Sequence, residues 1–466
     1  MTRGAPRCAT VAPMRPQPLR AARGVPARAL LFALACVPAL AAAQSFSLPT
    51  FSFSSGPGDE ALHKVVVVSR HGVRTPTAPA AELANWAAQP WPARDQPLAA
   101  LTPRGAALAR VMGRWYREYA ATQGMIPAAG CPDPGALFVY ADVPERTRAT
   151  AQALIDGFAP DCGFAVRTRQ GAKVDPVFHP LEAGVCRLDP LVAQTRVLER
   201  VGGDANRATR DLKAQFGALQ SVLDCCKPAL CLAFGRAERC TLADLPTAIT
   251  PVPDGAGLAL IGALPIASTA TELFLLEYLD GLPMPDVGWG RVTPAQIRDL
   301  LRLHTEQYDL MQRTPYLARR MGSALASRLA NAVTSTRMLG FGVVDPAVRD
   351  AKFVMVVGHD TNLWNLAAMM DVSWSQPGWQ RNQTPPGGAL MFEVREGKDK
   401  KLRVYTSYVA QSMEQMRNAT PLTGDVQPQR TPLRIPGCSS QAQGFPCTLD
   451  EFAVALRNVI DRECVE

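Results

Sequence analysis

The sequence lacks a long hydrophobic run, an internal repeat and any low-complexity segment. Its apolar stretch from Ala29 to Leu40 has twelve residues, whereas a helix that spans a membrane needs about 20. Hydrophobic residues make up 47% of the chain and charged residues 19%, which excludes a fibrous or disordered protein. The 466 residues are enough for two domains or for one domain with a large insertion, because single cores stop growing at roughly 250 to 300 residues.

The sequence also has little net charge outside its first 43 residues. That segment holds six arginines and no acidic residue, then the apolar stretch and Ala41–Ala43, which is typical of an export signal cleaved after Ala43. Its removal lowers the formal net charge from +8 to +2, so no nucleic-acid or membrane-surface partner is indicated. We expect a periplasmic or secreted protein without a stable membrane anchor, whose residues 44–59 form a flexible leader rich in Ser, Pro and Gly.

Paired C-x2-C motifs, which are common in structural zinc sites, are absent among the ten cysteines that follow Ala43. An even number of cysteines in an exported chain favours disulfides. Spacing makes Cys231–Cys240 and Cys438–Cys447 natural local pairs. Zinc held by the cluster from Cys225 to Cys240 is the alternative, but we expect neither a metal nor a cofactor.

Strand and helix patterns alternate in the first and last parts of the chain. The run Val65–Val68 is typical of a strand that is covered on both faces. Thr102 followed by Pro103 predicts a helix start, and Thr448 opens a C-terminal helix. Further strands are predicted at 137–141, 353–358, 388–394 and 401–409. This alternation predicts an α/β protein with a parallel or mixed central sheet flanked by helices.

The middle of the chain has a different pattern. Between residues 187 and 305 helix follows helix, apart from a short stretch around Leu258–Ile261. We therefore predict a smaller all-α domain at 187–305 that is inserted between the two parts of an α/β domain, 60–186 and 306–466. A long helical segment is expected from 296 to 338.

Histidine is rare in this chain, and two of the five histidines share a context. His71 directly follows the strand pattern "VVVVSR", and His359 directly follows "VMVVG". Ligands of open α/β sheets bind outside the carboxyl ends of the strands, so two loops 288 positions apart can face one pocket. Either histidine alone is more often a structural residue. Together they indicate a site.

The neighbours of these histidines narrow the chemistry. Arg70 and Arg74 flank His71, and guanidinium groups suit the oxygens of a phosphate. A neutral imidazole can displace an alcohol from phosphorus and become a phosphohistidine. Asp360 directly follows His359 and could protonate the leaving oxygen. These residues suffice for phosphoryl transfer without a metal.

The motifs "RHGVRTP" (70–76) and "GHDTN" (358–362) resemble the two signatures of the histidine acid phosphatases, the acid-acting branch of the histidine phosphatase superfamily. The likeness covers essentially the whole mature chain, and includes "LTPRG" (101–105), "ADVPERTRAT" (141–150) and "LMQRTPYLARR" (310–320). Within the family the chain resembles the bacterial periplasmic phytases and glucose-1-phosphatases. The resemblance implies a phosphoglycerate-mutase-like fold and a small phosphomonoester as the substrate.

The resemblance also implies a role for each motif residue. His71 would be the phosphorylated nucleophile and Asp360 the proton donor. The phosphate-binding residues would be Arg70, Arg74, Arg146 and His359. Thr77, Glu272 and Arg313 lie in segments that line the substrate pocket of relatives, although Glu272 could instead be a structural ion-pair residue.

The same resemblance implies four disulfides, which join Cys131 to Cys162, Cys186 to Cys464, Cys231 to Cys240 and Cys438 to Cys447. Cys225 and Cys226 have no counterpart in it. They could pair with each other, pair between chains or stay reduced, although we expect a monomer.

The identity of the phosphomonoester is less constrained by the sequence. The "HGVR" and "HDTN" motifs favour phytate, but Ala78 stands where several phytases have a lysine. A broad acid phosphatase and a sugar-phosphate phosphatase are the alternatives. A phosphate-ester binding protein without activity would lack the nucleophile or the acid. A mutase of the same superfamily is disfavoured, because this chain is expected to be exported and to contain disulfides. Because the donor carboxyl must be protonated, we expect activity to peak at acid pH.

Overall fold

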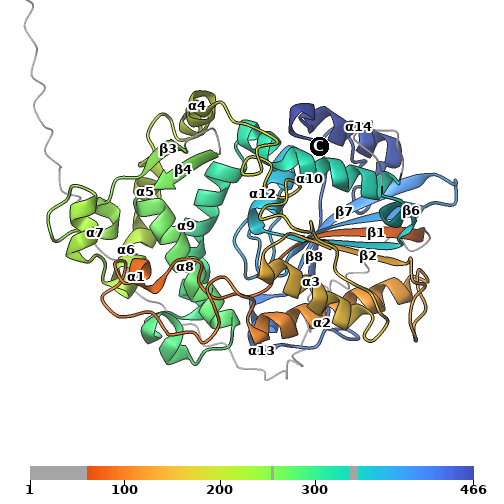
Figure 1. Cartoon of the computed structure of the whole chain (residues 1–466), viewed down its shortest axis with the longest axis horizontal. Helices are drawn as coiled ribbons and strands as arrows, with labels where there is room; N and C mark the ends of the chain where they lie inside the picture. Colours follow the sequence, from red (N-terminus) through yellow and green to blue (C-terminus); the bar gives the residue numbers. More distant parts are fainter. Residues whose placement is uncertain (1–59, 253–256, 336–344, 466) are drawn as a thin grey trace, which may run out of the picture. The chain divides into compact units, whose positions relative to one another are not determined.

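A mixed sheet of seven strands forms the centre of the computed structural model (Figure 1). The strand order is β2-β5-β1-β6-β7-β8, and β9 pairs with β7. Strands β2, β5 and β1 are parallel, whereas β6, β7 and β8 run antiparallel to their neighbours. The strands are β1 (Ala61–Arg70), β2 (Leu137–Ala141), β5 (Phe353–Gly358), β6 (Ala389–Glu396), β7 (Leu402–Ala410), β8 (Gln429–Pro432) and β9 (Cys447–Thr448).

The structure describes residues 60–252, 257–335 and 345–465. The expected signal peptide (1–43) and leader (44–59) lie outside the described residues. Among the described helices, none is both long and apolar enough to cross a membrane.

Helices cover both faces of the sheet, as the sequence predicted. Val66 and Val68 of β1 belong to the apolar core shared with α10, α12 and α14, and Val65 and Val67 belong to the core shared with α2 and α3 on the opposite face. All four valines are 0% exposed. Because both faces of the strand are covered, its sequence is a continuous apolar run instead of an alternating one. These helices are α2 (Pro103–Thr122), α3 (Glu145–Phe158), α10 (Pro315–Thr334), α12 (Asp360–Met369) and α14 (Leu449–Val459).

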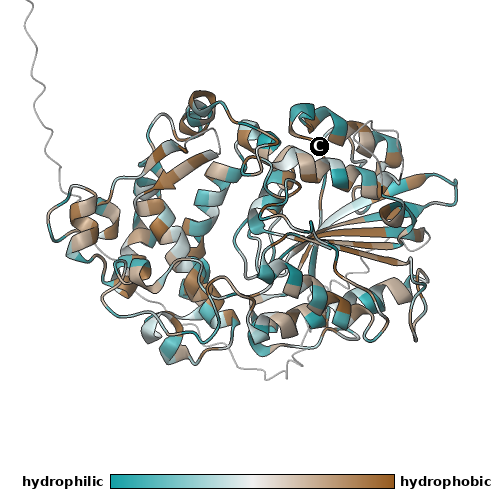
Figure 2. Cartoon of the chain, in the orientation of Figure 1, coloured by the Kyte–Doolittle hydropathy of each residue, from teal (hydrophilic) through white to brown (hydrophobic). Residues whose placement is uncertain are grey.

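The predicted helix starts are confirmed. The hydroxyl of Thr102 accepts a hydrogen bond from the backbone N–H of Gly105, and Pro103 occupies the first position of α2. Thr448 and Glu451 form a reciprocal capping box at the start of α14. Figure 2 shows largely hydrophobic central strands surrounded by helices of mixed polarity.

The region 187–305 is mostly helical, but the prediction of an all-α unit was too narrow. Strands β3 (Ala248–Val252) and β4 (Gly257–Ile261) form an antiparallel hairpin there, so the stretch around Leu258 is half of a two-stranded sheet. The helices are α4 (Pro190–Arg200), α5 (Arg207–Asp211), α6 (Lys213–Leu223), α7 (Pro228–Ala233), η1 (Leu242–Asp244), α8 (Ala263–Leu279), η3 (Met284–Gly290) and α9 (Pro294–Gln312).

Within the described residues, the helical segment predicted from 296 to 338 is two helices; its last three residues lie outside them. Helix α9 ends at Gln312 and α10 begins at Pro315. Pro315 disfavours helical geometry at the residue before it, which explains the break. The remaining short helices are α1 (Ala80–Leu83), α11 (Pro346–Asp350), α13 (Met413–Asn418) and η5 (Arg462–Cys464).

Five disulfides cross-link the described residues: Cys131–Cys162, Cys186–Cys464, Cys225–Cys226, Cys231–Cys240 and Cys438–Cys447. Four of them are the pairs that the resemblance implied, and the fifth joins Cys225 to its neighbour Cys226.

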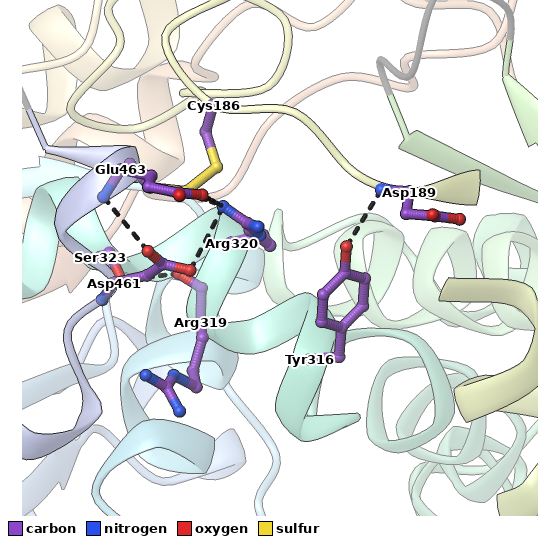
Figure 3. The surroundings of a disulfide bond; sticks show 9 residues. Cys186, Asp189, Tyr316, Arg319, Arg320, Ser323, Asp461 and Glu463 are labelled. Carbon is purple, nitrogen blue, oxygen red and sulfur yellow. Dashed lines mark hydrogen bonds and ion pairs between the residues drawn. A yellow bond between two sulfur atoms is a disulfide. The ribbon is translucent and has the colours of Figure 1, made fainter. Parts of the chain in front are cut away.

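Around Cys186–Cys464, polar contacts attach the C-terminal segment to α10 (Figure 3). Arg320 forms ion pairs with Asp461 (3.3 Å) and Glu463 (3.0 Å). The backbone N–H of Asp461 donates a hydrogen bond to the hydroxyl of Ser323 (2.8 Å).

A buried carboxyl in the helical region gives a prediction about stability. Glu277 of α8 accepts a hydrogen bond from the backbone N–H of Gly288 (3.0 Å). Burial raises its pKa from 4.5 to about 7, and this hydrogen bond and Arg94 offset the rise only in part. Since the folded chain holds this proton more tightly than the unfolded chain, stability falls as pH rises from 4.5 through about 7.

We therefore expect Glu277→Gln to leave stability unchanged near pH 4.5 and to raise it by up to about 3 kcal/mol above pH 7. The substituted amide still accepts the hydrogen bond from Gly288. Urea unfolding across this pH range measures the difference, with the exposed Glu82→Gln as a control. Identical pH profiles for wild type and Glu277→Gln would contradict the prediction.

Candidate active site

Strand register brings three loops together at one edge of the sheet. In the parallel pair β1–β5, Arg70 lies opposite Gly358, and in the pair β2–β5, Ala141 lies opposite Val357. The next residue along each strand therefore emerges at the same carboxyl edge, where α/β sheets bind ligands. These residues are His71, Asp142 and His359. The prediction that the loops after β1 and β5 face one another is confirmed, with the His71 and His359 ring centroids 5.6 Å apart.

The backbone around His71 is held on both sides. The His71 N–H donates to the carbonyl of Gly358 (2.9 Å), and the His71 carbonyl accepts from Gly387 (3.0 Å). The loop also packs closely on the start of α2, where a Cβ at Gly105 would lie 2.2 Å from the carbonyl oxygen of Val73. Glycine at this position is what lets the loop and the helix approach.

The side chain of His71 is arranged as a neutral imidazole. Its Nδ1 lies 2.9 Å from the carbonyl oxygen of Gly72, so Nδ1 carries the proton and Nε2 keeps its lone pair. Burial lowers the pKa of His71 well below 6.5, and the positive charges of Arg70, Arg146 and Arg74 lower it further.

Arg70 lies at the centre of an ion-pair network and is 0% exposed. Its Nη2 contacts Oε1 of Glu272 and lies 2.9 Å from Oδ2 of Asp360, while its Nη1 donates to the carbonyl of Thr384 (2.6 Å). Burial alone would lower the pKa of Arg70, but Asp360 and Glu272 together raise it above its usual value.

Glu272 joins the helical region to this network. It lies on the buried helix α8, and its Oε2 accepts a hydrogen bond from Nη2 of Arg74 (2.9 Å). Burial would raise the pKa of Glu272, but Arg74 and Arg70 hold it well below 4.5. Glu272 is therefore an ion-pair residue that contacts two of the predicted phosphate-binding arginines.

Arg146 and His359 form the other side of the cluster. Nη2 of Arg146, in the first turn of α3, lies 3.3 Å from Nδ1 of His359. Nε2 of His359 lies 2.7 Å from Oδ2 of Asp142. Burial lowers the pKa of both Arg146 and His359, although the hydrogen bond to Asp142 opposes the effect at the histidine.

Asp360 occupies the first position of α12. Its Oδ1 accepts a hydrogen bond from the backbone N–H of Thr361 (2.8 Å), and its Oδ2 pairs with Arg70. The carboxyl is thus fixed beside the same guanidinium group that Glu272 contacts.

The structure does not bring every predicted residue to this cluster. Thr77 is exposed, and Ala78 is half-buried against the apolar core of the helical region. Arg313 follows α9, where its guanidinium donates to the carbonyl of Val372 (3.0 Å) and lies 3.5 Å from Asp309. Substrate-binding roles for Thr77 and Arg313 stay predictions.

Sequence reasoning missed three polar residues of the site. Asp142 directly follows β2, so the strand-end pattern that identified His71 and His359 would have identified it too. His179 lies 2.8 Å from the same Asp142 oxygen, and His304 has ligand atoms close to Glu272 and Asp360. No strand precedes either histidine, so no local signal distinguished them.

Two groups in the site have the composition of a metal site. In each, the ligand atoms lie within 4.8 Å of one another: Asp142, His179 and His359 in one group, and Glu272, His304 and Asp360 in the other. However, the Asp142 oxygen is hydrogen-bonded to both of its histidines, and Arg70 forms ion pairs with Glu272 and Asp360, while Arg74 also pairs with Glu272. A third group, Cys226, Cys231 and Cys240, consists of disulfide sulfurs.

Known proteins match this chain along most of its length. The model of the histidine phosphatase superfamily (branch 2) matches residues 61–231 and 267–410. Phytase AppA of Escherichia coli (strain K12) is 37% identical over 412 residues, which cover 87% of this chain and 93% of the phytase. A glucose-1-phosphatase of Salmonella typhimurium (strain LT2) is 30% identical over 396 residues, covering 84% and 91%. The apo structure of Hafnia alvei phytase has a TM-score of 0.80 and 35% identity, and the match covers 88% of this chain and 100% of the phytase.

Proposed function

This chain belongs to branch 2 of the histidine phosphatase superfamily and is a phosphomonoester hydrolase, and we propose that its substrate is phytate. We further propose that it releases phosphate through a phosphohistidine intermediate at His71. The observation that carries this proposal is the state of His71. Its Nδ1 forms a hydrogen bond with the Gly72 carbonyl. No described residue forms a hydrogen bond with Nε2, so the Nε2 lone pair is free to attack phosphorus.

The first half-reaction transfers the phosphoryl group to the enzyme. Nε2 of His71 forms a bond to phosphorus while the bond from phosphorus to the ester oxygen breaks. Asp360, in its protonated form, gives its proton to that leaving oxygen, and the alcohol departs. In the second half-reaction water attacks phosphorus, the P–N bond breaks and the Asp360 carboxylate takes the proton from water. Inorganic phosphate leaves and both residues return to their starting states.

Three guanidinium groups supply the charge that this reaction needs. Arg70, Arg74 and Arg146 lie around His71, and each lowers its pKa through its positive charge. A phosphomonoester dianion placed against Nε2 would meet their N–H donors, which suit phosphate oxygens in geometry and charge. We assign these arginines and His359 to phosphate binding, since electrostatic stabilisation of the transferring group is the main contribution in such sites.

The helical region, residues 187–305 in the proposed domain organisation, would shape the rest of the substrate pocket. It contributes Glu272, which contacts Arg70 and Arg74 from α8. We propose that substrate specificity arises there and in the loop after Arg74.

Two relatives with different substrates bear on the choice of phosphomonoester. The phytase is 37% identical and the glucose-1-phosphatase 30% identical, each over more than four-fifths of the chain, which favours phytate. Ala78 favours the second candidate, a sugar-phosphate phosphatase, because a small half-buried apolar residue adds no charge for a substrate with six phosphates.

Phosphate release from phytate, glucose 1-phosphate and p-nitrophenyl phosphate distinguishes these candidates. We expect kcat/KM for phytate to exceed that for glucose 1-phosphate by at least about tenfold, the scale of discrimination that a shaped pocket provides. His71→Ala protein prepared in the same way controls for contaminating phosphatases. The opposite preference would make the sugar-phosphate phosphatase the better description, and release from none of the three would contradict the proposed function.

We also propose that the mature protein is an exported monomer. The N-terminal pattern of arginines, apolar run and small residues before Gln44 supports export with cleavage after Ala43, and the five disulfides suit an oxidising compartment.

A further inference from the structure

Two histidine ring nitrogens and one backbone N–H converge on the carboxylate of Asp142. Its Oδ2 lies 2.7 Å from Nε2 of His359 and 2.8 Å from Nε2 of His179. Its Oδ1 accepts from the backbone N–H of Val143 (2.8 Å). Asp142 is 0% exposed and directly follows β2. Burial would raise the pKa of Asp142, but the hydrogen bonds from His179 and His359 hold it well below its usual value, so the carboxylate is ionised and accepts from both rings.

From this geometry we propose that Asp142 is a positioning residue, which fixes the tautomer and orientation of His359 for phosphate binding. The inference rests on the proposed function, because it assigns a task to a residue of the same site. Asp142 itself does not touch the reacting atoms. It acts through the ring of His359.

The tautomer follows from the acceptor. Since Asp142 accepts at Oδ2, His359 must carry a proton on Nε2, and in the neutral ring Nδ1 then holds a lone pair. That lone pair faces Nη2 of Arg146 at 3.3 Å, so the guanidinium can donate to it. Nδ1 is thereby directed to the side where Arg146 and His71 lie, which is the side that a phosphate would occupy.

A bound phosphate changes what Nδ1 must do. An oxygen of the dianion needs a donor, so the ring has to take a second proton from solvent, at Nδ1, and donate it. The negative charge of Asp142 stabilises the imidazolium that results, whereas burial and the charges of Arg146 and His179 disfavour it when no phosphate is bound. His359 would therefore bind phosphate as a doubly protonated ring held between Asp142 and a phosphoryl oxygen.

His179 is the second donor to the same oxygen, but it has a different position. Its side chain is 31% exposed, and its ring centroid lies 5.0 Å from that of His359. The loop that carries it is anchored separately, since the carbonyl of Phe178 accepts a hydrogen bond from Asn362. His179 thus adds one donor to Asp142, and His359 keeps its own hydrogen bond without it.

Nitrogen chemical shifts of histidine-labelled protein report the tautomer directly. In the wild type without ligand, we expect His359, assigned by comparison with His359→Asn, to carry its proton on Nε2. Titration with inorganic phosphate should convert it to the doubly protonated form. The proposal would be overturned if His359 in the wild type were protonated at Nδ1 alone, or if its protonation state did not change on addition of phosphate.

Asp142→Asn tests the role of the carboxylate. The introduced amide has one acceptor for three donors, so its NH2 group must face either Val143 or the histidines. We expect the Nε2-protonated form of His359 to be lost and kcat/KM for p-nitrophenyl phosphate to fall by about 10- to 100-fold. Wild-type tautomer and wild-type phosphate affinity in this variant would refute the role of Asp142.

Asp175→Asn is the matched control. Asp175 is also 0% exposed, and its carboxylate bonds Tyr140 and the backbone N–H of Val177 but no histidine side chain. Its main-chain carbonyl accepts from the backbone N–H of His179, a bond that Asp175→Asn retains. We expect this variant to keep the wild-type tautomer and kcat/KM, and His179→Gln to keep the tautomer. Equal losses in Asp142→Asn and Asp175→Asn would show a merely structural role. Because tautomer and phosphate titration need no turnover, they test this inference even if the wild type releases no phosphate, an outcome that would contradict only the proposed function.

Discussion

His71→Ala is expected to abolish phosphate release, with kcat lowered by about 10⁴-fold or more, because removal of a nucleophile leaves only binding and electrostatic stabilisation. The fold should survive. Among the described residues, the side chain of His71 hydrogen-bonds only the neighbouring carbonyl of Gly72. The loop is held by backbone hydrogen bonds to Gly358 and Gly387 that alanine can also make. Thermal unfolding and turnover of p-nitrophenyl phosphate measure the two effects separately.

His63→Ala is the control for this variant, because His63 lies on the same strand but is half-exposed and pairs with Glu396 at 3.5 Å. It should keep wild-type turnover. More than a few per cent of residual activity in His71→Ala would rule out His71 as the nucleophile.

Arg70→Met is expected to cost both activity and stability. The substitution leaves two buried carboxyl groups, Glu272 and Asp360, without the guanidinium that lies between them. Removal of one partner from a buried ion pair typically destabilises a protein by about 3–5 kcal/mol. Turnover should also be lost, since Arg70 is next to the nucleophile and is proposed to bind the phosphate.

The stability loss in Arg70→Met should depend on pH in a defined direction. In the wild type, the arginines hold the pKa of Glu272 below 4.5, so Glu272 contributes stability above pH 4.5 that is lost as pH falls through its lower, folded value. The variant lacks much of that contribution. The difference between the two proteins should therefore be largest above pH 4.5 and shrink in stronger acid.

Arg94→Met is a suitable comparison for Arg70→Met. Arg94 pairs with one carboxylate, Asp280, at 2.7 Å, and its side chain is more exposed. We expect a smaller stability loss there and unchanged turnover. An Arg70→Met protein that is as stable as Arg94→Met at neutral pH would contradict the proposed importance of this network.

The sequence predicted much of the site because its main residues lie at the ends of recognisable strands. Val65–Val68 identified β1 as a buried strand, and this placed Arg70 and His71 at the carboxyl edge of the sheet. Asp142 has the same relation to β2 and could have been identified in the same way. The contact from Glu272 to Arg70 spans 202 positions and depends on how α8 packs, which no local pattern encodes.

Two features of the fold could not be predicted from local sequence patterns. The hairpin β3–β4 was missed because Pro251 lies inside β3, and proline in an apolar run argues against a strand. The pairing of Cys225 with Cys226 was one of three alternatives that composition left open, and the structure selects it.

Rapid mixing of the enzyme with p-nitrophenyl phosphate, followed by an alkaline quench and mass spectrometry of the peptide that contains His71, tests the central claim most directly. Alkali preserves a phosphohistidine that acid would hydrolyse. The proposed mechanism predicts a phosphoryl group on His71 in the wild type and none on any residue of His71→Ala. A phosphoryl group on another residue, or turnover by wild-type enzyme whose His71 never becomes phosphorylated, would contradict it.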